Sequence, residues 1–136
     1  MMELIKSMFI SASGMRVQGE RSRVIAENVA NANSLPSNPG QEPYRRKVLV
    51  FKNVLDRELG ADVVEVHKRT VDRSEFGKRY DPGHPGANPD GYVLLPNVNG
   101  LIEAIDMKEA QRTYEANLNM IETARTMINR TIELIR

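Results

Sequence analysis

The sequence predicts a mainly α protein with a small β-rich insert, in which a long N-terminal helix and a long C-terminal helix pair like a coiled coil. No Pro occurs between Met2 and Ala32, and neither Pro nor Gly occurs from Leu101 to Arg136. The residues between these stretches contain dense groups of Pro, Gly and Asn, which are typical of turns. Two long helices separated by short strands and tight loops follow from this distribution.

The first helix is expected over residues 3–33. Apolar or small residues recur there at the three- and four-residue spacing of one helix face, namely Leu4, Ile5, Met8, Phe9, Ala12, Met15, Ile25, Ala26 and Val29. Gln18, Gly19 and Ser22 interrupt this apolar stripe in its middle. Asn-rich residues that lead to Pro36 favour a helix end near residue 33.

The insert is expected over residues 34–100. Strands are predicted at residues 44–52, 62–71 and 92–95, where β-branched and aromatic residues are concentrated. Asp81–Gly86 and Asn88–Gly91 consist almost entirely of turn-forming residues. The middle of the chain is therefore expected to form a small β structure with tight loops.

The last helix is expected over residues 101–136. Large side chains recur every seven residues at Met107, Tyr114, Ile121, Ile128 and Ile135, flanked by Ala110, Leu118, Ala124 and Ile132. This period is typical of a coiled-coil seam. A helix far longer than the globular mean of about 11 residues needs a long partner, and only residues 1–33 match its length. Residues 1–33 and 101–136 are thus predicted to form one helical domain that carries the insert.

Size and composition exclude several classes of protein. The 136 residues fit one ordinary domain, and 19 basic against 18 acidic residues give a net charge of +1, which disfavours binding to nucleic acid. Cysteine is absent, so disulfides and thiolate metal sites are excluded. No apolar run is long enough to span a membrane, and the N-terminal residues lack the pattern of a cleaved signal peptide.

No catalytic, cofactor or metal site is expected. His84 lies between Asp81 and Asp90, but this spacing matches neither a zinc site nor a calcium loop, and Asp, Pro and Gly here are typical of turns. No serine-hydrolase elbow or phosphate-binding loop is present. The residues therefore favour assembly over chemistry.

Three segments resemble one known family. The residues Ser11–Met15, Gln18, Arg21 and Ala26–Asn33 resemble the N-terminal signature of flagellar rod and hook proteins. The segment from Tyr80 to Asn99 is more specifically similar to the proximal rod members, and Ala110, Arg112 and Tyr114–Asn117 resemble the family's C-terminal pattern. Gly86 departs from the family, in which Asp is frequent at this position.

The resemblance implies a structural subunit of the bacterial flagellar basal-body rod that is not an enzyme and needs no cofactor. It implies assembly with itself and with other rod subunits into the drive shaft that transmits torque and contains the export channel. Delivery is then expected through the flagellar type III export apparatus, without a cleaved signal peptide, to the periplasmic rod. No nucleic-acid partner and no transmembrane segment are implied.

Two groups of residues are the candidate binding surfaces. The assembly interface is predicted on the terminal helices at Leu4, Met8, Ala12, Met15, Ile25, Asn28, Val29, Asn31, Met107, Tyr114, Asn117, Leu118, Ile121, Ile128, Ile132 and Ile135. The insert docking loop is predicted at Tyr80, Asp81, Pro82, His84, Pro85, Asn88, Asp90, Gly91 and Tyr92. An amphipathic stripe shows that a surface is buried without identifying its partner, so an intramolecular core and a contact between subunits are both open.

Other functions are also compatible with parts of the sequence. The heptad seam, with Arg16, Arg21 and Arg23, is compatible with a coiled-coil dimer that binds nucleic acid or a regulatory partner. A cell-wall hydrolase would need paired carboxylates, for which only Glu65, Asp72 and Glu75 are loosely grouped. Within the rod family, a subunit at a neighbouring level is the alternative.

Overall fold

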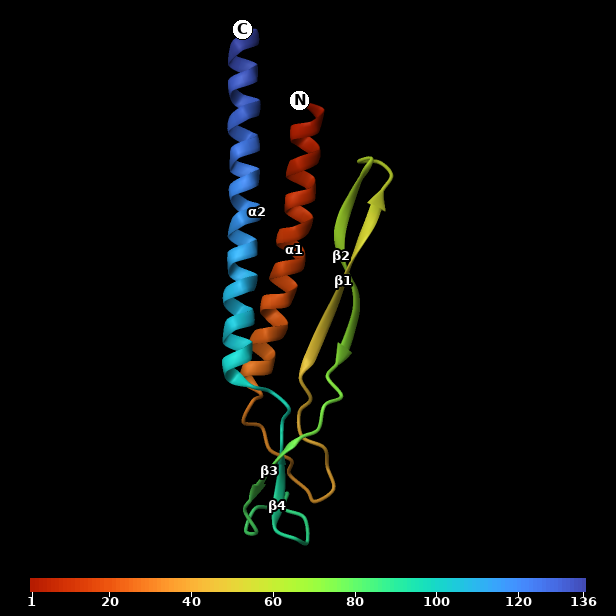
Figure 1. Ribbon diagram of the computed structural model, residues 1–136, viewed down its shortest axis with the longest axis vertical. Helices are drawn as coiled ribbons and strands as arrows, with labels where there is room; N and C mark the ends of the chain where they lie inside the picture. Colours follow the sequence, from red (N-terminus) through yellow and green to blue (C-terminus); the bar gives the residue numbers. More distant parts are fainter. The chain divides into compact units, whose positions relative to one another are not determined.

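A computed structural model describes all 136 residues of the chain. A helix lies at each end of the sequence, with two β-hairpins between them (Figure 1). The elements are α1 (Met2–Ala30), β1 (Lys47–Asp56), β2 (Ala61–Val71), β3 (Gly77–Tyr80), β4 (Tyr92–Leu95) and α2 (Gly100–Ile135). The predicted helices at both ends and the β-rich insert are confirmed, with bounds that differ by a few residues.

Asparagine side chains define one end of each helix. The Asn31 side chain donates to the Glu27 carbonyl at 2.9 Å, and the Ala32 N–H then donates to Val29 at 3.2 Å, which tightens the chain into a turn. At the start of α2, Asn99 Oδ1 accepts from the N–H of Leu101 at 3.0 Å, a typical N-cap. These side chains satisfy backbone groups that the helices leave unpaired.

Each β-hairpin is a separate two-stranded antiparallel sheet, β1–β2 and β3–β4 (Figure 1). In the second sheet, Gly77 pairs with Leu95 and Tyr80 with Tyr92. The sequence does not predict β3, because its four residues show no alternation of apolar and polar side chains. In the structure all four are exposed. Its strand conformation depends on pairing with β4, whose Val93 is fully buried.

The chain divides into two compact units. Unit 1 comprises Met1–Ser22, Leu49–Lys68 and Met107–Arg136, and unit 2 comprises Arg23–Val48 and Arg69–Asp106. Each unit combines helical residues with residues of the insert. The predicted division into a helical domain (residues 1–33 and 101–136) and an insert (residues 34–100) describes roles in an assembled rod. It stays a prediction.

The expectation of coiled-coil-like pairing is wrong. In unit 1 the two helices approach closely at a small and a polar residue, because a Cβ atom on Gly14 would lie only 2.7 Å from Asn117 Nδ2. The buried α2 residues of this unit are Ala110 and Ala124, whereas Tyr114 and Ile135 of the predicted seam are exposed, Ile135 by 75%. A coiled coil needs the large residues as buried knobs. The buried residues of α2 in this unit, Ala110 and Ala124, are instead small and lie fourteen positions apart, which is two seven-residue periods.

The β1–β2 hairpin also packs against α1 within unit 1. The Ser13 hydroxyl donates to the Ile10 carbonyl at 2.7 Å and accepts from the Val64 N–H at 3.2 Å. Ser11 and Ser13 are both buried. Since the hairpin occupies part of the surface of α1, this helix does not offer a continuous apolar seam to α2.

Candidate functional site

Asn28 forms the centre of a polar cluster in unit 2. This α1 side chain is almost fully buried, and its amide donates to the Lys47 carbonyl at 3.0 Å and accepts from the Lys47 N–H at 2.9 Å. The Tyr44 hydroxyl donates to the same Asn28 oxygen at 2.7 Å. Asn28 thus pairs with the first residue of β1 as a neighbouring strand would. Burial raises the pKa of Tyr44, and nearby Glu27 adds to this effect.

Arg46 precedes Lys47, the backbone partner of Asn28, and its side chain contacts three carboxylates. Its Nε donates to Glu103, and its terminal nitrogens lie 3.4 Å from Asp106 and 3.6 Å from Asp72. Glu103 is fully buried, and its second oxygen has no hydrogen-bond partner. The hydrogen bond with Glu103 raises the pKa of Arg46, so the guanidinium stays charged. A buried carboxylate of this kind is tolerated only with its cation in place.

Asn97 joins the same cluster to the end of β2. Its Oδ1 accepts from the Arg46 N–H at 2.7 Å, and its amide donates to the carbonyl of Asp72 at 2.9 Å. The N–H of Ser74 donates to the Asp72 carboxylate at 2.8 Å, which lowers the pKa of Asp72, and Arg46 contributes to this shift.

We call the set Asn28, Tyr44, Arg46, Asp72, Asn97, Glu103 and Asp106 the polar junction. It links the end of α1, the start of β1, the end of β2 and the start of α2. Apart from Asn28, none of these residues belonged to the two predicted binding surfaces. Arg46 and Glu103 are 57 positions apart, and no pattern of spacing identifies such a pair.

The junction is suited to holding segments together. Asp72, one of the carboxylates considered for a hydrolase, is engaged by Arg46 and Ser74 and is therefore not available as a free acid or base. The cluster contains one cation and three carboxylates, and the carboxylates of Asp72 and Glu103 accept hydrogen bonds from Ser74 and Arg46. Such a network holds these four segments together, because removing one member leaves the hydrogen-bonding groups of its partners unsatisfied.

Hydrogen bonds and one aromatic contact connect residues within the predicted insert docking loop. The Asn88 side chain accepts from the Tyr92 N–H at 2.9 Å, and the His84 ring accepts from the Gly86 N–H at 2.9 Å. Tyr80 and Tyr92 form an edge-to-face pair with ring centres 5.3 Å apart. Asp81, Pro82, Pro85, Asp90 and Gly91 complete the loop, in which Gly91 has a φ of 89°. The His84 ring therefore helps to hold this turn through its bond with Gly86.

Gly86 makes a close contact that explains why a larger residue does not fit. A Cβ atom at this position would lie 2.2 Å from the carbonyl oxygen of Pro36. Because that oxygen belongs to the backbone, it has little freedom to move away. The residue that departs from the family pattern thus allows the docking loop to approach residues 34–43 in unit 2.

The predicted assembly-interface residues differ in exposure. Two are buried, Ile25 and Asn28. Nine are half-buried, namely Leu4, Met8, Ala12, Met15, Asn31, Met107, Asn117, Ile121 and Ile128. Five are exposed, namely Val29, Tyr114, Leu118, Ile132 and Ile135. The structure thus places two of them in the interior and leaves five available to partners.

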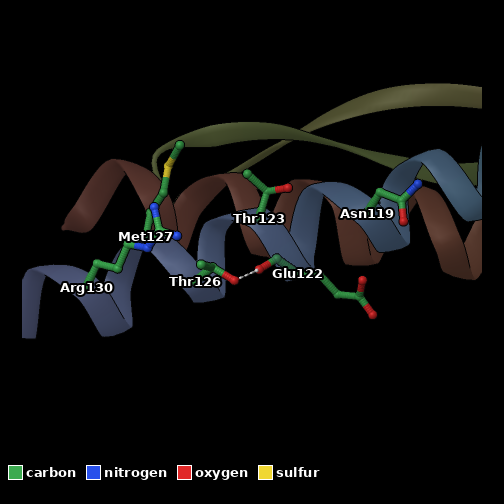
Figure 2. A pocket seen from close by; sticks show the side chains of 6 residues that line it. All are labelled: Asn119, Glu122, Thr123, Thr126, Met127 and Arg130. Carbon is green, nitrogen blue, oxygen red and sulfur yellow. Dashed lines mark hydrogen bonds between the residues drawn. The ribbon is translucent and has the colours of Figure 1, made fainter.

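Both helices leave other large apolar side chains exposed. In unit 1 these include Met2, Phe9, Met120, Met127 and Leu134. An open hollow of about 370 Å³ on α2 is lined by Asn119, Glu122, Thr123, Thr126, Met127 and Arg130, whose side chains Figure 2 shows. Neither α1 nor α2 contains a stretch long and apolar enough to cross a membrane.

Comparison with known proteins gives consistent matches. Residues 90–134 match the family model described as "Flagellar basal body rod FlgEFG protein C-terminal". The chain is 47% identical over 127 residues to the flagellar basal-body rod protein FlgC of Agrobacterium fabrum, covering 93% of this chain and 91% of that protein. It is 35% identical over 135 residues to FlgC of Salmonella typhimurium, covering 98% of each. It is 32% identical over 148 residues to FlgC of Bacillus subtilis, covering 98% of this chain and 99% of that protein.

Proposed function

Because this chain belongs to the FlgC family of flagellar basal-body rod proteins, we propose that its terminal helices carry the contacts between subunits while its insert selects the neighbour. The chain is a structural subunit of the flagellar basal-body rod and assembles there with other rod subunits. The alternative of a coiled-coil regulatory or nucleic-acid-binding dimer is not supported by any of these relatives.

The observation that carries the proposal is the exposure of apolar side chains on both terminal helices. Phe9 on α1 is 59% exposed, and Met127 and Leu134 on α2 are 50% and 86% exposed. Large exposed apolar side chains that gather on one element mark interaction sites in soluble proteins. Burying each of them between subunits contributes roughly 1.5–3 kcal/mol. The predicted interface residues that are already exposed, such as Leu118 and Ile132, add to this surface.

The insert docking loop supports a second part of the proposal, the selection of a neighbour. Its hydrogen bonds, its prolines and the Tyr80–Tyr92 pair hold one conformation before binding. A loop ordered in advance loses little conformational entropy when it docks. Tyr80 and Tyr92 are exposed at its edge, where amphipathic rings are suited to recognition by shape.

Further parts of the proposal follow from membership of a rod. The subunit reaches the periplasmic part of the basal body through the flagellar type III export apparatus. Helical stacking of such subunits encloses the export channel and transmits torque. No enzyme activity is part of this function.

The experiment is complementation of a strain that lacks the gene for this chain. Wild-type chain should restore rods and swimming, whereas Ile121→Asp and Ile128→Asp should not, because each places a charge in a half-buried helix contact. Gln111→Asp, which adds the same charge at an exposed position of α2 outside both predicted surfaces, is the matched control and should assemble. Rods that form normally with either isoleucine variant would contradict the role of the helices.

Replacing residues 81–90, within the loop between β3 and β4, by a Gly/Ser linker of equal length tests the role of the insert without removing Val93, Asn97 or Asn99. Export and incorporation are measured separately, by the amount of chain outside the cytoplasm and by the amount in purified basal bodies. Export should persist and incorporation should fail. Incorporation at the wild-type level would show that the terminal helices alone select the level of the rod.

A further inference from the structure

The turn between β1 and β2 is a rigid structure in unit 1. Asp56 Oδ1 accepts from the N–H groups of Glu58 at 3.0 Å and Leu59 at 3.1 Å. The N–H of Gly60 donates to the Asp56 carbonyl at 2.7 Å, and Gly60 has a φ of 70°, which favours glycine. These hydrogen bonds define the backbone of the turn and the orientation of the Asp56 side chain.

This turn and α1 form a hollow that is both apolar and acidic. Phe9, Asp56, Glu58 and Leu59 line an open space of about 240 Å³. Asp56 and Glu58 are exposed, and neither carboxylate forms an ion pair within the chain. Lys6 approaches Gly60, but its ion pair is with Glu3 at 3.8 Å. Arg57, between them in the sequence, does not line the hollow, so two carboxylates without an ion pair lie there beside a largely exposed aromatic ring.

A complementary surface lies on α2 in the same unit. Met127, Arg130 and Leu134 follow at positions i, i+3 and i+7, so they share one helix face. Both apolar side chains are largely exposed, and the exposed Arg130 forms no ion pair within the chain. Figure 2 shows Met127 and Arg130 at one end of the hollow on α2, with Glu122 eight residues away along the helix. Eight residues correspond to about 12 Å along a helix, so Glu122 does not neutralise Arg130. Glu133, three residues after Arg130, is a closer acid on this helix but forms no ion pair with it.

We infer that the β1–β2 turn of one subunit docks onto the Met127–Arg130–Leu134 face of α2 in a second copy of this chain. Arg130 then lies between Asp56 and Glu58, and the apolar side chains of α2 cover Phe9 and Leu59. Charge complementarity selects this occupant, because an acidic and apolar hollow meets a basic and apolar helix face. The inference rests on the proposed function, for which it names one contact between copies.

The proposed contact joins two different surfaces, the β1–β2 turn of one subunit and the α2 face of the next. A contact between unlike surfaces of identical chains is heterologous, and it continues from subunit to subunit unless its rotation closes a ring. A rod requires repetition of this open kind. The proposed contact therefore supplies a repeating connection that a two-fold symmetric dimer contact would not give.

Charge reversal in the purified full-length chain tests the contact. Sedimentation equilibrium at concentrations up to about 1 mM, which resolves even weak association, is measured for the wild type, Arg130→Glu, the double variant Asp56→Lys/Glu58→Lys, and all three substitutions together. Either reversal alone should weaken self-association about tenfold or more, and the triple variant should recover most of the loss. Circular dichroism of each variant checks that the fold is retained, and Arg136→Glu is a matched control outside the proposed face.

Several outcomes would overturn the inference. If the wild type stays monomeric at the highest concentration, a second copy is excluded as the occupant. If Arg130→Glu and the double variant both associate as strongly as the wild type, these charged side chains do not form the contact. Losses that add in the triple variant would show that the two surfaces do not meet. None of these results bears on rod membership, because complementation by the wild-type chain measures that separately.

Discussion

The two compact units differ in what their interiors contain. Unit 1 places small residues between its elements, with Ala110 and Ala124 buried and Gly14 directly against Asn117. Unit 2 instead buries an amide and a carboxylate, Asn28 and Glu103, within a hydrogen-bonded network. Apart from Val17, the buried apolar residues of unit 1 are alanines, whereas unit 2 combines the buried Val24, Ile25 and Val93 with polar groups that bond to one another.

This difference indicates where each unit obtains its stability. Each buried CH₂ group contributes about 0.8 kcal/mol, so alanines stabilise unit 1 much less than buried leucines would. Its larger apolar side chains remain exposed, among them Met127 and Leu134. Unit 1 is therefore expected to gain stability from neighbouring subunits, whereas unit 2 depends on its own polar junction.

The largest expected effect is that of removing the cation from the polar junction. Arg46→Met leaves the buried Glu103 carboxylate without its partner and should lower the free energy of unfolding by about 3–5 kcal/mol. Denaturant unfolding followed by circular dichroism measures this change. In unit 1 the matched control is Arg21→Met, whose partner Glu109 lies at 3.4 Å and is exposed, so the loss should stay within about 1 kcal/mol.

The comparison fails if these two arginine variants lose equal stability. Arg46→Met/Glu103→Leu sharpens the test, because removing both charges should recover part of the loss. No recovery would show that the packing of the Arg46 side chain matters more than its charge.

Hydrogen exchange of the isolated monomer should separate the two units. We expect amides of residues 4–22 and 107–135 to exchange about 100-fold faster than those of the network around Asn28, because unit 1 lacks its neighbours. Mass spectrometry of peptides from each unit measures the ratio. Strong protection throughout both terminal helices would contradict the idea that partners complete unit 1.

A smaller effect is expected from truncating the central amide. Asn28→Ala leaves the N–H and carbonyl of Lys47 and the Tyr44 hydroxyl without their partner, which should cost about 1–3 kcal/mol. Tyr44→Phe removes one of these hydrogen bonds and should cost about 1 kcal/mol. Thermal unfolding compares both with Asn119→Ala, an exposed residue of unit 1 that should be nearly neutral.

The smallest expected effect is an acid dependence of unit 2. The pKa of Asp72 is lowered from its ordinary 3.8 by hydrogen bonds from Ser74 and by Arg46. A lowered folded-state pKa gives stability that is present above pH 3.8 and is lost as the pH falls through the folded-state value. Asp72→Asn should therefore reduce the slope of stability against pH in this acidic range. An unchanged slope would show that other carboxylates determine the acid response.

Much of the secondary structure was predictable because it depends on local signals. The lack of Pro in residues 2–32 and of Pro and Gly in residues 101–136 permits both helices, and Tyr92–Leu95 was identified as a strand within its observed bounds. Strand β3 was missed because its fully exposed residues become a strand only by pairing with β4. The resemblance of residues 11–33 and 80–99 to the rod family also needed only the sequence.

The sequence by itself thus determined the family, the helices at both ends and the turn-rich insert. Only the tertiary structure decided which helix residues are buried and which polar groups meet. The seven-residue period predicted a seam of Met, Tyr and Ile, but close approach at Gly14 places Ala110 and Ala124 inside. Arg46 and Glu103, which are 57 positions apart, meet only because the fold brings the starts of β1 and α2 together. Periodicity reports the local geometry of one helix, whereas burial and ion pairing depend on what the rest of the chain places against it.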